Sequence, residues 1–487
     1  MAIAIVASVL LAFAVFSVRG FAAVEAAGIP PGVAFTSGWE EESHYALWRV
    51  LHDQPLYADT ARPPFASAYF NWLFYSGYAW LLRPAVALWG DACIPFTGRL
   101  ITATFTLAGA GAFFLVVGRA LTPQGRLPAL GLATLVFLGP LSGWWAHTVR
   151  PDMGALMLET MGLAIVLLGA RSRPWAAVLL GGLCFYGAWA CKQTYVFGAG
   201  TAVLYLFSRR LPRHALVLSG GCGLLGHLTL ALLGPTYQAA FRETTVANAY
   251  SLSLGLTNTS DMLLKTAPLW LLGWVGFLAT IDADRPLAKD LRHCGLIGLG
   301  LTLPLLFIAN CKLGASSYYY LPVLPMLGLV ATGGLVHPRR PMLCLAGFAL
   351  AGTLSLLLLS GRVGRLTLDE QADELAAIWQ VWQNEAEPRF SHRTNLNLPW
   401  LNASSPPFVL AYNYQADRQA GRRFADDGIG GLISRGYFRS LLLPRDTGEV
   451  YDGGRLDRYR GGETMGNMRI FRLVEPTPGA PGSGPSP

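Results

Sequence analysis

The sequence predicts an all-α polytopic membrane bundle followed by a small α/β domain. Of the 487 residues, 53% are hydrophobic and only 14% are charged, whereas soluble proteins carry about 25% charged residues. Apolar stretches long enough to cross a bilayer as helices recur up to about Gly361. The chain is polar beyond that point. We therefore expect a membrane domain over residues 1–361 and a separate domain over residues 362–475.

The apolar stretches predict about eleven transmembrane helices. The first lacks the basic residues that open a signal peptide, so we expect it to be retained as a span and not cleaved. The expected spans are residues 2–19, 99–118, 128–147, 153–170, 174–190, 194–208, 215–234, 263–281, 293–309, 317–335 and 341–361.

Arginine in the short connections predicts the orientation of these spans. Cytoplasmic loops of membrane proteins carry an excess of Lys and Arg. With eleven spans and a cytoplasmic N-terminus, all the basic connections fall on the cytoplasmic side: Arg119/Arg126, Arg171/Arg173, Arg209/Arg210/Arg213, Arg285/Lys289/Arg292 and Arg339/Arg340. The net charge of +8 comes from arginine, which clusters in these short loops, so it indicates a membrane protein without a nucleic-acid partner.

Residues 67–90 are apolar enough to suggest a further span, but we predict that they lie on the membrane surface. They contain Arg83-Pro84 near the centre and are rich in Trp and Tyr, which prefer the interface. Counting them as a span would put the acidic residues around Glu40 and Asp152 on opposite faces. Residues 20–98 are therefore expected to form the first outer loop, with helices at the interface.

Two acidic motifs on this outer face suggest chemistry. Glu40-Glu41-Glu42 repel one another and are costly to desolvate. A solvated loop is the simpler explanation of such a run. However, Arg62-Pro63-Pro64-Phe65 follows shortly afterwards, and Arg150-Pro151-Asp152 ends a later span on the same side. Together they suggest a site that combines carboxylates with cations.

The lysines also gather on the outer face. The chain has only four, and Lys192, Lys265 and Lys312 lie at outer ends of spans. A lone lysine there is commonly an interfacial side chain that reaches the headgroups. Three of them beside the acidic motifs suit a reaction with a phosphate leaving group and an acceptor that must be deprotonated.

The polar C-terminal region predicts a small α/β domain on the extracytoplasmic side of the membrane. An amphipathic helix is expected over Asp369–Asn384 and a second helix over Gln415–Ala425. Short strands are expected at Phe408–Tyr412, Ser440–Leu443 and Met468–Val474. Loop 235–262 is polar, and residues 476–487 have the composition of a disordered tail.

Four motifs in order resemble a known superfamily. Glu41-Glu42-Ser43-His44-Tyr45 is similar to the Asp-Glu-x-His-aromatic stretch of protein O-mannosyltransferases and to the Asp-Glu-x-x-Tyr-Ala stretch of lipid A aminoarabinose transferases. Arg62-Pro63-Pro64-Phe65 is similar to their Lys-Pro-Pro-Leu motif. Arg150-Pro151-Asp152 resembles their second acidic site, and residues 317–325 resemble their Tyr-x-Leu-Pro-x-x-Pro signature. The chain thus resembles the GT-C membrane glycosyltransferases over most of residues 1–340.

The resemblance implies an inverting transfer of a sugar from a polyprenyl-phosphate donor to a lipid, glycan or protein hydroxyl. Glu41 would be the base that removes the acceptor proton, helped by Asp152, and Glu42 would be a further catalytic carboxylate. The donor phosphate would be bound by Arg62, Lys192, Lys312, Arg150 and Tyr319. The chain departs from the pattern in having Glu41 where an Asp is usual and Arg62 where a Lys is usual; arginine keeps the charge but changes the geometry.

The motifs are also compatible with a metal site and with a second class of function. Glu41, Glu42, Asp152 and His44 could hold a divalent cation, although histidine near carboxylates is common without a metal. The other function class is a transporter or flippase of lipid-linked sugars, or a non-catalytic assembly factor. Charges gathered at one face and the lack of an internal repeat favour the enzyme. We expect a multi-pass protein of a bacterial inner membrane, with its active site outside the cytoplasm.

Overall fold

The computed structural model describes residues 40–66, 68–121, 125–239, 250–278, 281, 285–312, 314–335, 354, 368–409, 414–415, 417–418, 421–445 and 454–474. The expected span 2–19, all of span 341–361 except residue 354, and the tail 476–487 lie outside the described residues.

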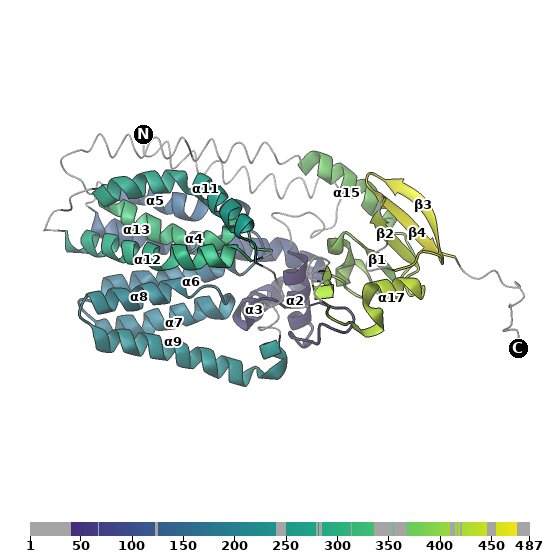
Figure 1. Cartoon of the computed structure of the whole chain (residues 1–487), viewed down its shortest axis with the longest axis horizontal. Coiled ribbons are helices and arrows are strands. Elements are labelled where there is room, and N and C mark those ends of the chain that lie inside the picture. The colour runs from purple at the N-terminus through teal and green to yellow at the C-terminus, as the bar shows by residue number, and fades with distance from the viewer. Residues whose placement is uncertain are drawn as a thin grey trace, which may run out of the picture.

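Long helices form a bundle, and a smaller domain with a sheet lies beyond one end of it (Figure 1). Within the described residues, a helix overlaps each of the predicted spans. These helices are α4 (Ile94–Ala120), α5 (Arg126–Leu138), α6 (Asp152–Gly169), α7 (Pro174–Cys191), α8 (Phe197–Ser208), α9 (Pro212–Leu232), α11 (Leu252–Leu278), α12 (Pro286–Asn310) and α13 (Val323–Leu335).

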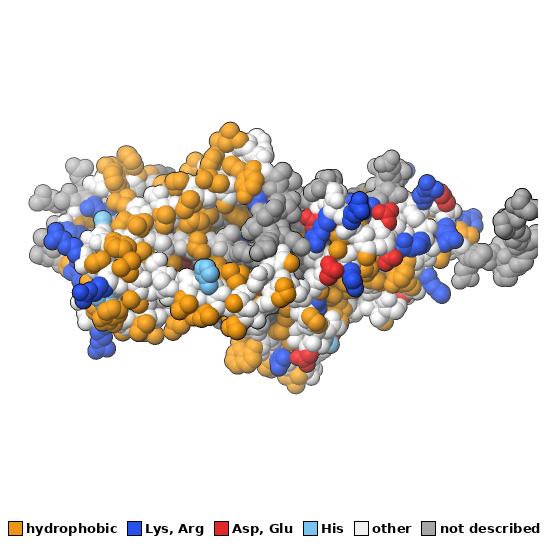
Figure 2. All heavy atoms as spheres, turned by 60° about the horizontal axis from the view of Figure 1, so that its bottom comes forward, with side chains coloured by type: hydrophobic (Ala, Val, Ile, Leu, Met, Phe, Trp, Pro, Cys, Tyr) orange, Lys and Arg blue, Asp and Glu red, His pale blue; other side chains and the backbone are white. Residues whose placement is uncertain are grey.

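Length and composition support a membrane bundle. Five helical segments of the described chain are long and apolar enough to cross a bilayer, and α5, α8 and α13 are shorter apolar helices. Large apolar side chains such as Leu115, Leu183 and Ile308 are about 60% exposed. Figure 2 shows hydrophobic side chains over most of the bundle face in view. Such a surface is typical of contact with lipid. The total of eleven spans stays a prediction.

Two helix boundaries differ from the prediction for identifiable reasons. Helix α5 ends at Leu138 because Gly139-Pro140 follows, and a residue before proline avoids the helical conformation. Helix α11 begins at Leu252, within the stretch expected to be a polar loop. Its Asn258 Nδ2 donates hydrogen bonds to the backbone carbonyls of Asn310 and Ala315, both at 3.2 Å. Polarity in this segment therefore serves helix packing.

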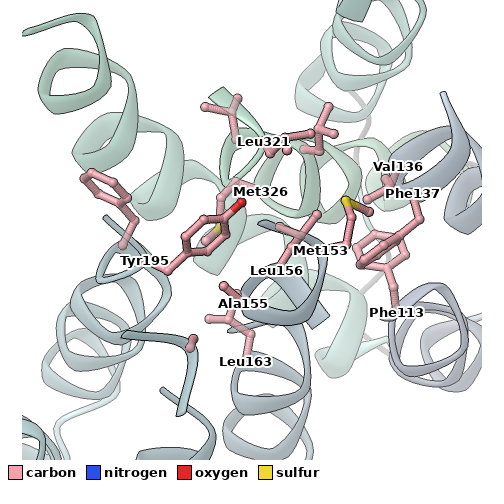
Figure 3. Packing of buried hydrophobic residues seen from close by; sticks show 14 of the residues in the cluster. Phe113, Val136, Phe137, Met153, Ala155, Leu156, Leu163, Tyr195, Leu321 and Met326 are labelled. Atoms are coloured by element: carbon pink, nitrogen blue, oxygen red, sulfur yellow. The ribbon is translucent and has the colours of Figure 1, made fainter. Parts of the chain in front are cut away.

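The core of the bundle surrounds α6. Met153 and Leu156 of this helix are fully buried beside Phe113 of α4 and Phe137 of α5 (Figure 3). Close approach there requires glycine: a Cβ added to Gly109 would lie 2.4 Å from Cε1 of Phe137. Small residues at helix contacts are typical of membrane bundles. This packing holds the first turn of α6 in a fixed place.

The two ends of the bundle differ in charge. Asp290 Oδ2 accepts from Arg171 at 2.7 Å, and Asp290 Oδ1 lies 3.3 Å from Arg209 Nη1, so these basic connections share one end. Figure 2 shows Lys and Arg gathered at the bundle end away from the C-terminal domain. Asp152 begins α6 at the opposite end, about 27 Å away along an 18-residue helix. The acidic motifs therefore lie opposite the arginine-rich connections.

Helices α2 (Glu41–Leu51) and α3 (Trp72–Trp89) lie between the bundle and the C-terminal domain (Figure 1). Helix α3 packs on α2, α4 and α7, and it is not among the helices apolar and long enough to span. Its Trp80 and Trp89 are about 70% exposed. Exposed tryptophans favour the interfacial placement predicted for this segment.

The C-terminal domain contains a mixed sheet with strand order β1-β2-β4-β3. The strands are β1 (Arg389–Ser391), β2 (Ser440–Pro444), β3 (Tyr459–Met465) and β4 (Met468–Leu473). Strand β1 is parallel to β2, and the other pairs are antiparallel. The expected strands at Ser440–Leu443 and Met468–Val474 are present as β2 and β4. Strands β1 and β3 were not predicted.

A helix covers each face of this sheet. Leu442 and Ile470 pack with Ile378 of α15 (Leu368–Trp382), the predicted amphipathic helix. Leu441 and the neighbouring Leu443 face the other way, toward α17 (Gly428–Ser434). The alternation along β2 is that of a strand buried on both faces.

Two of the predicted elements in this domain differ from the prediction over part of the described residues. Phe408 and Val409 are buried but belong to no strand; the rest of the segment expected to be a strand lies outside the described residues. The expected helix Gln415–Ala425 does not continue through residues 421–424. Gly421 has φ +86°, a conformation that ends a helix.

Candidate active site

The first turn of α2 carries the acidic run, and it is buried. Glu40, Glu41 and Glu42 are 1%, 4% and 3% exposed, so the run is not a solvated loop. Acids in a first turn interact favourably with the helix N-terminus. That effect is modest, and a buried carboxylate still needs partners. Each of the three finds different ones.

Glu40 is held by an arginine from the bundle. Its Oε2 accepts from Arg99 Nη2 at 2.6 Å, and its Oε1 accepts from the backbone N–H of Val149 at 2.7 Å. Burial raises the pKa of this carboxyl, but Arg99, His44 and the hydrogen bonds outweigh burial and lower the pKa to about 2. Glu40 is therefore ionised and ties α2 to α4 and to the loop before α6.

Glu41 points toward the C-terminal domain. Its Oε1 accepts from Thr394 Oγ1 at 2.9 Å, whereas Oε2 is buried without a hydrogen-bond partner. Burial raises its pKa to about 7, against the lowering effects of the backbone, Thr394 and Arg150. A carboxylate with such a pKa and one unpaired oxygen is suited to accept a proton near neutral pH.

Glu42 points toward α3 and the segment before it. Its Oε1 accepts from the Tyr75 hydroxyl and from the backbone N–H of Tyr69, the latter at 3.3 Å. Ser43 Oγ donates to Oε2 at 3.3 Å. Burial raises the pKa of Glu42 to about 7 as well. Both oxygens of Glu42 therefore have hydrogen-bond partners, whereas Oε2 of Glu41 has none.

A second charged cluster lies beside these acids. Asp152 Oδ1 accepts from Lys192 Nζ at 2.6 Å, and Asp152 Oδ2 lies 4.0 Å from Arg150 Nε. All three side chains are buried. Arg150 also lies near enough to Glu41 and Glu42 to lower the pKa of each. The two motifs, some 110 residues apart in sequence, are thus joined in one site.

Aromatic rings surround the two cations. The Arg150 guanidinium carbon lies 4.8 Å from the centre of the Phe70 ring and 5.8 Å from that of Tyr318. Lys192 Nζ lies 4.8 Å from the Tyr318 ring centre and 4.9 Å from that of Tyr319. Rings at these distances attract a cation. The tyrosines belong to a 3₁₀ turn at Ser317–Tyr320, directly before α13.

The structure does not place all the predicted phosphate ligands in this cluster. Arg62 is on the surface, with its side chain 79% exposed, and its Nε lies 3.4 Å from Asp59 Oδ2. Nearby Phe65 packs on Phe408 and Phe424 of the C-terminal domain. Lys312 follows α12, and its backbone bridges that of Tyr250. The site assembled from the prediction therefore consists of Glu41, Glu42, Arg150, Asp152, Lys192 and Tyr319.

His44 lies one turn after Glu41 and is buried, with neither ring nitrogen hydrogen-bonded. Burial lowers its pKa to about 4, so the ring is neutral. Its ring centre lies 6.4 Å from that of Trp400. Among the described residues, no three His, Cys, Asp or Glu side chains are grouped so that they could hold a metal ion. The set Glu41, Glu42, Asp152 and His44 is therefore not arranged as a metal centre.

Sequence reasoning missed several residues of the site, among them Arg99, Tyr75 and Thr394. Arg99 opens an apolar span, and an arginine in that position is a detectable signal. Tyr75 gave no such signal among the many aromatics of its segment. Thr394 is an unremarkable residue in a polar domain, so its contact with Glu41 becomes evident only in three dimensions.

Comparison with protein-family models gives no match for this chain. Comparison with curated proteins also gives none. Solved structures, in contrast, match its fold over nearly the whole chain. The crystal structure of ArnT from Cupriavidus metallidurans bound to undecaprenyl phosphate has a TM-score of 0.58 at 16% identity, covering 96% of this chain and 98% of ArnT. The apo oligosaccharyltransferase of Archaeoglobus fulgidus has a TM-score of 0.51 at 12% identity, covering 94% of this chain and 73% of that protein.

The chain therefore has the fold of ArnT and of this oligosaccharyltransferase. The resemblance seen in the sequence motifs is confirmed at the level of the fold. At these identities the likeness concerns the fold, and function must be argued from the site.

Proposed function

We propose that this protein is a glycosyltransferase that moves a sugar from a polyprenyl-phosphate donor to an acceptor hydroxyl, with inversion at the anomeric carbon. One observation carries the proposal: Glu41, with a pKa near 7, lies near the buried Arg150 at one end of a GT-C bundle, and Arg150 in turn lies beside Asp152, which holds Lys192. A base next to phosphate-binding cations is what such a transfer requires.

The reaction is a single displacement. The free Oε2 of Glu41 takes the proton of the acceptor hydroxyl, whose oxygen forms a bond to the anomeric carbon. The bond from that carbon to the phosphate oxygen breaks, and its electron pair leaves on the phosphate. Because nucleophile and leaving group occupy opposite faces of the carbon, the configuration inverts. The proton ends on Glu41 and the charge on polyprenyl phosphate.

The cations are expected to stabilise the charge that develops on the leaving group. Arg150 offers a planar fork of donors that matches phosphate oxygens, and Lys192 supplies a compact charge. Asp152 holds Lys192 in place at 2.6 Å before the donor binds. Tyr319, beside Lys192, would donate its hydroxyl to the phosphate. Water exclusion by the surrounding rings strengthens all these interactions.

Arg62 and Lys312 are expected to act outside this buried cluster. Both are accessible to the surroundings in part or in full, so they would attract the anionic headgroup before it enters. We also propose that the site end of the bundle faces away from the cytoplasm, because the arginine-rich connections lie at the other end. A bacterial inner membrane is the setting that this orientation and the polyprenyl donor suggest.

The proposal is tested by incubating the purified protein with a panel of labelled polyprenyl-phosphate hexoses and pentoses in detergent and measuring release of polyprenyl phosphate. Donor cleavage that depends on an added lipid, glycan or peptide acceptor supports a transferase. The transporter alternative is examined with the same lipids in proteoliposomes. Movement of intact donor between leaflets, with no cleavage of any donor in the panel, would show that the protein is a transporter and not a glycosyltransferase.

A further inference from the structure

We propose that Thr394 of the C-terminal domain is a positioning residue for Glu41, so that this domain completes the catalytic site. The inference rests on the proposed function. Its starting point is the hydrogen bond from Thr394 Oγ1 to Glu41 Oε1 at 2.9 Å, between residues 353 positions apart. Both side chains are buried.

Thr394 is presented by a rigid turn. It opens the 3₁₀ turn Thr394–Asn397, which is fixed from inside by Asn397. Asn397 Nδ2 donates to the carbonyls of Ser391 at 2.8 Å and of Phe408 at 2.9 Å, and its Oδ1 accepts from the N–H of Ser391. Buried amides with all these bonds satisfied allow little movement.

The following turn is held by a second amide and an arginine. Asn402 Nδ2 donates to the carbonyls of Leu396 at 2.8 Å and Leu398 at 3.0 Å. Arg389, the first residue of β1, donates from Nε to Asn402 Oδ1 at 2.7 Å and from Nη2 to the carbonyl of Leu401 at 2.8 Å. The segment that carries Thr394 is therefore attached to the sheet of the domain.

This segment also packs tightly on α2. Leu398 and Val409 of the domain are buried with Tyr45 of α2 and with Ala66. The Trp400 ring lies edge-on against His44. These described residues form an apolar surrounding for the hydrogen bond from Thr394 to Glu41. Because the surroundings exclude water, that bond controls where the carboxylate points.

The hydrogen bond determines which oxygen of Glu41 can take the acceptor proton. With Oε1 occupied by Thr394, only Oε2 of Glu41 is available to an acceptor proton. The hydrogen bond also favours the ionised form of Glu41, as does the nearby Arg150, while the neighbouring Glu40 opposes it. Loss of the bond should let the carboxylate rotate and should raise its pKa further above the usual range.

The test compares Thr394→Ala, Thr394→Ser and Val409→Ala in the full-length protein. Thr394→Ala is expected to lower kcat about tenfold, since a hydrogen bond to a charged group is worth that much, and to move the acid limb of the pH–rate profile to higher pH. The KM for the donor should not change. Thr394→Ser keeps the hydroxyl and should restore kcat. Val409→Ala loosens the same contact without touching Glu41 and should leave the acid limb in place.

Two results would overturn the inference. One is a Thr394→Ala enzyme with the kcat and pH profile of the wild type. The other is an equal effect of Thr394→Ala and Val409→Ala, which would mean that Thr394 only docks the domain. The carboxyl infrared band of Glu41, assigned by its loss in Glu41→Gln, reports its pKa independently of activity. If the wild type transfers no sugar while that band still shifts in Thr394→Ala, the proposed function is wrong. Thr394 then sets the pKa of Glu41 but has no role in catalysis.

Discussion

Glu40 and Arg99 form a buried ion pair, with Oε2 and Nη2 2.6 Å apart. Because of this pair, the pKa of Glu40 is lowered, unlike the pKa values of the other two glutamates of the acidic run. Glu40 holds α2 against the bundle, whereas Glu41 and Glu42 keep raised pKa values. Three adjacent residues of one type therefore have different environments. Their substitutions should have different consequences.

Glu40→Gln is expected to destabilise the protein by about 3–5 kcal/mol, because it leaves the Arg99 charge buried without its partner. The pKa of Glu40 is lowered to about 2, so its contribution is present above the unfolded pKa near 4.5 and is lost as the pH falls toward 2. Thermal unfolding in detergent measures this. The double variant Glu40→Gln/Arg99→Met should recover part of the loss; no recovery would mean that the pair is not the source of the stability.

Glu41→Gln is expected to stabilise the protein above pH 7. The folded pKa of Glu41 is raised to about 7, so its favourable contribution is complete below the unfolded pKa near 4.5 and disappears as the pH rises through 7. An amide has no charge to desolvate. The gain should be roughly 1–3 kcal/mol at pH 8 and close to zero at pH 4. Equal unfolding temperatures of variant and wild type at pH 8 would show that the buried charge of Glu41 does not destabilise the protein.

Lys192→Ala is expected to weaken donor binding roughly tenfold to a hundredfold, because a charge-assisted hydrogen bond contributes about 1.5–3 kcal/mol. Titration of the purified variant with polyprenyl phosphate measures the loss. Lys192→Arg keeps the cation and should retain part of the affinity. Unchanged binding in Lys192→Ala would remove the cluster around Asp152 from the phosphate site.

Arg62→Ala should weaken donor binding less than Lys192→Ala does, since Arg62 is largely exposed and pairs with Asp59. Arg62→Lys should keep most of the wild-type affinity. Affinity that falls as far in Arg62→Ala as in Lys192→Ala would show that Arg62 moves into the buried site when the donor binds. A loss of expression without a change in the affinity of the folded fraction would assign Arg62 to the membrane surface.

The sequence predicted a mostly helical membrane protein and named several residues that the structure brings together in the candidate site. Hydropathy located the described helices, since a bilayer demands apolar segments of fixed length. The order of the motifs predicted that Glu41 and Asp152 belong to one site, and in the structure both lie near Arg150. The number of arginines in each loop could predict which loops share one end of the bundle, because the excess of Lys and Arg in cytoplasmic loops is visible in the composition of the loop alone.

Other features depend on contacts between distant segments. The polar start of α11 was expected to be a loop because the tertiary hydrogen bonds of Asn258 cannot be seen in composition. Strand β1 has three residues, too short for periodicity to reveal. The partnership of Glu41 with Thr394 joins residues from the two ends of the chain. Such pairs are created by the fold and carry no local signal.

The central claim is that Glu41 is the base of a sugar transfer. Single-turnover transfer from a labelled polyprenyl-phosphate sugar, measured alongside donor binding for wild type and Glu41→Gln, tests it most directly. An amide cannot take the acceptor proton, so transfer should fall about 10²–10⁴-fold while the donor dissociation constant stays within about twofold of wild type. Transfer by Glu41→Gln at the wild-type rate would contradict the claim.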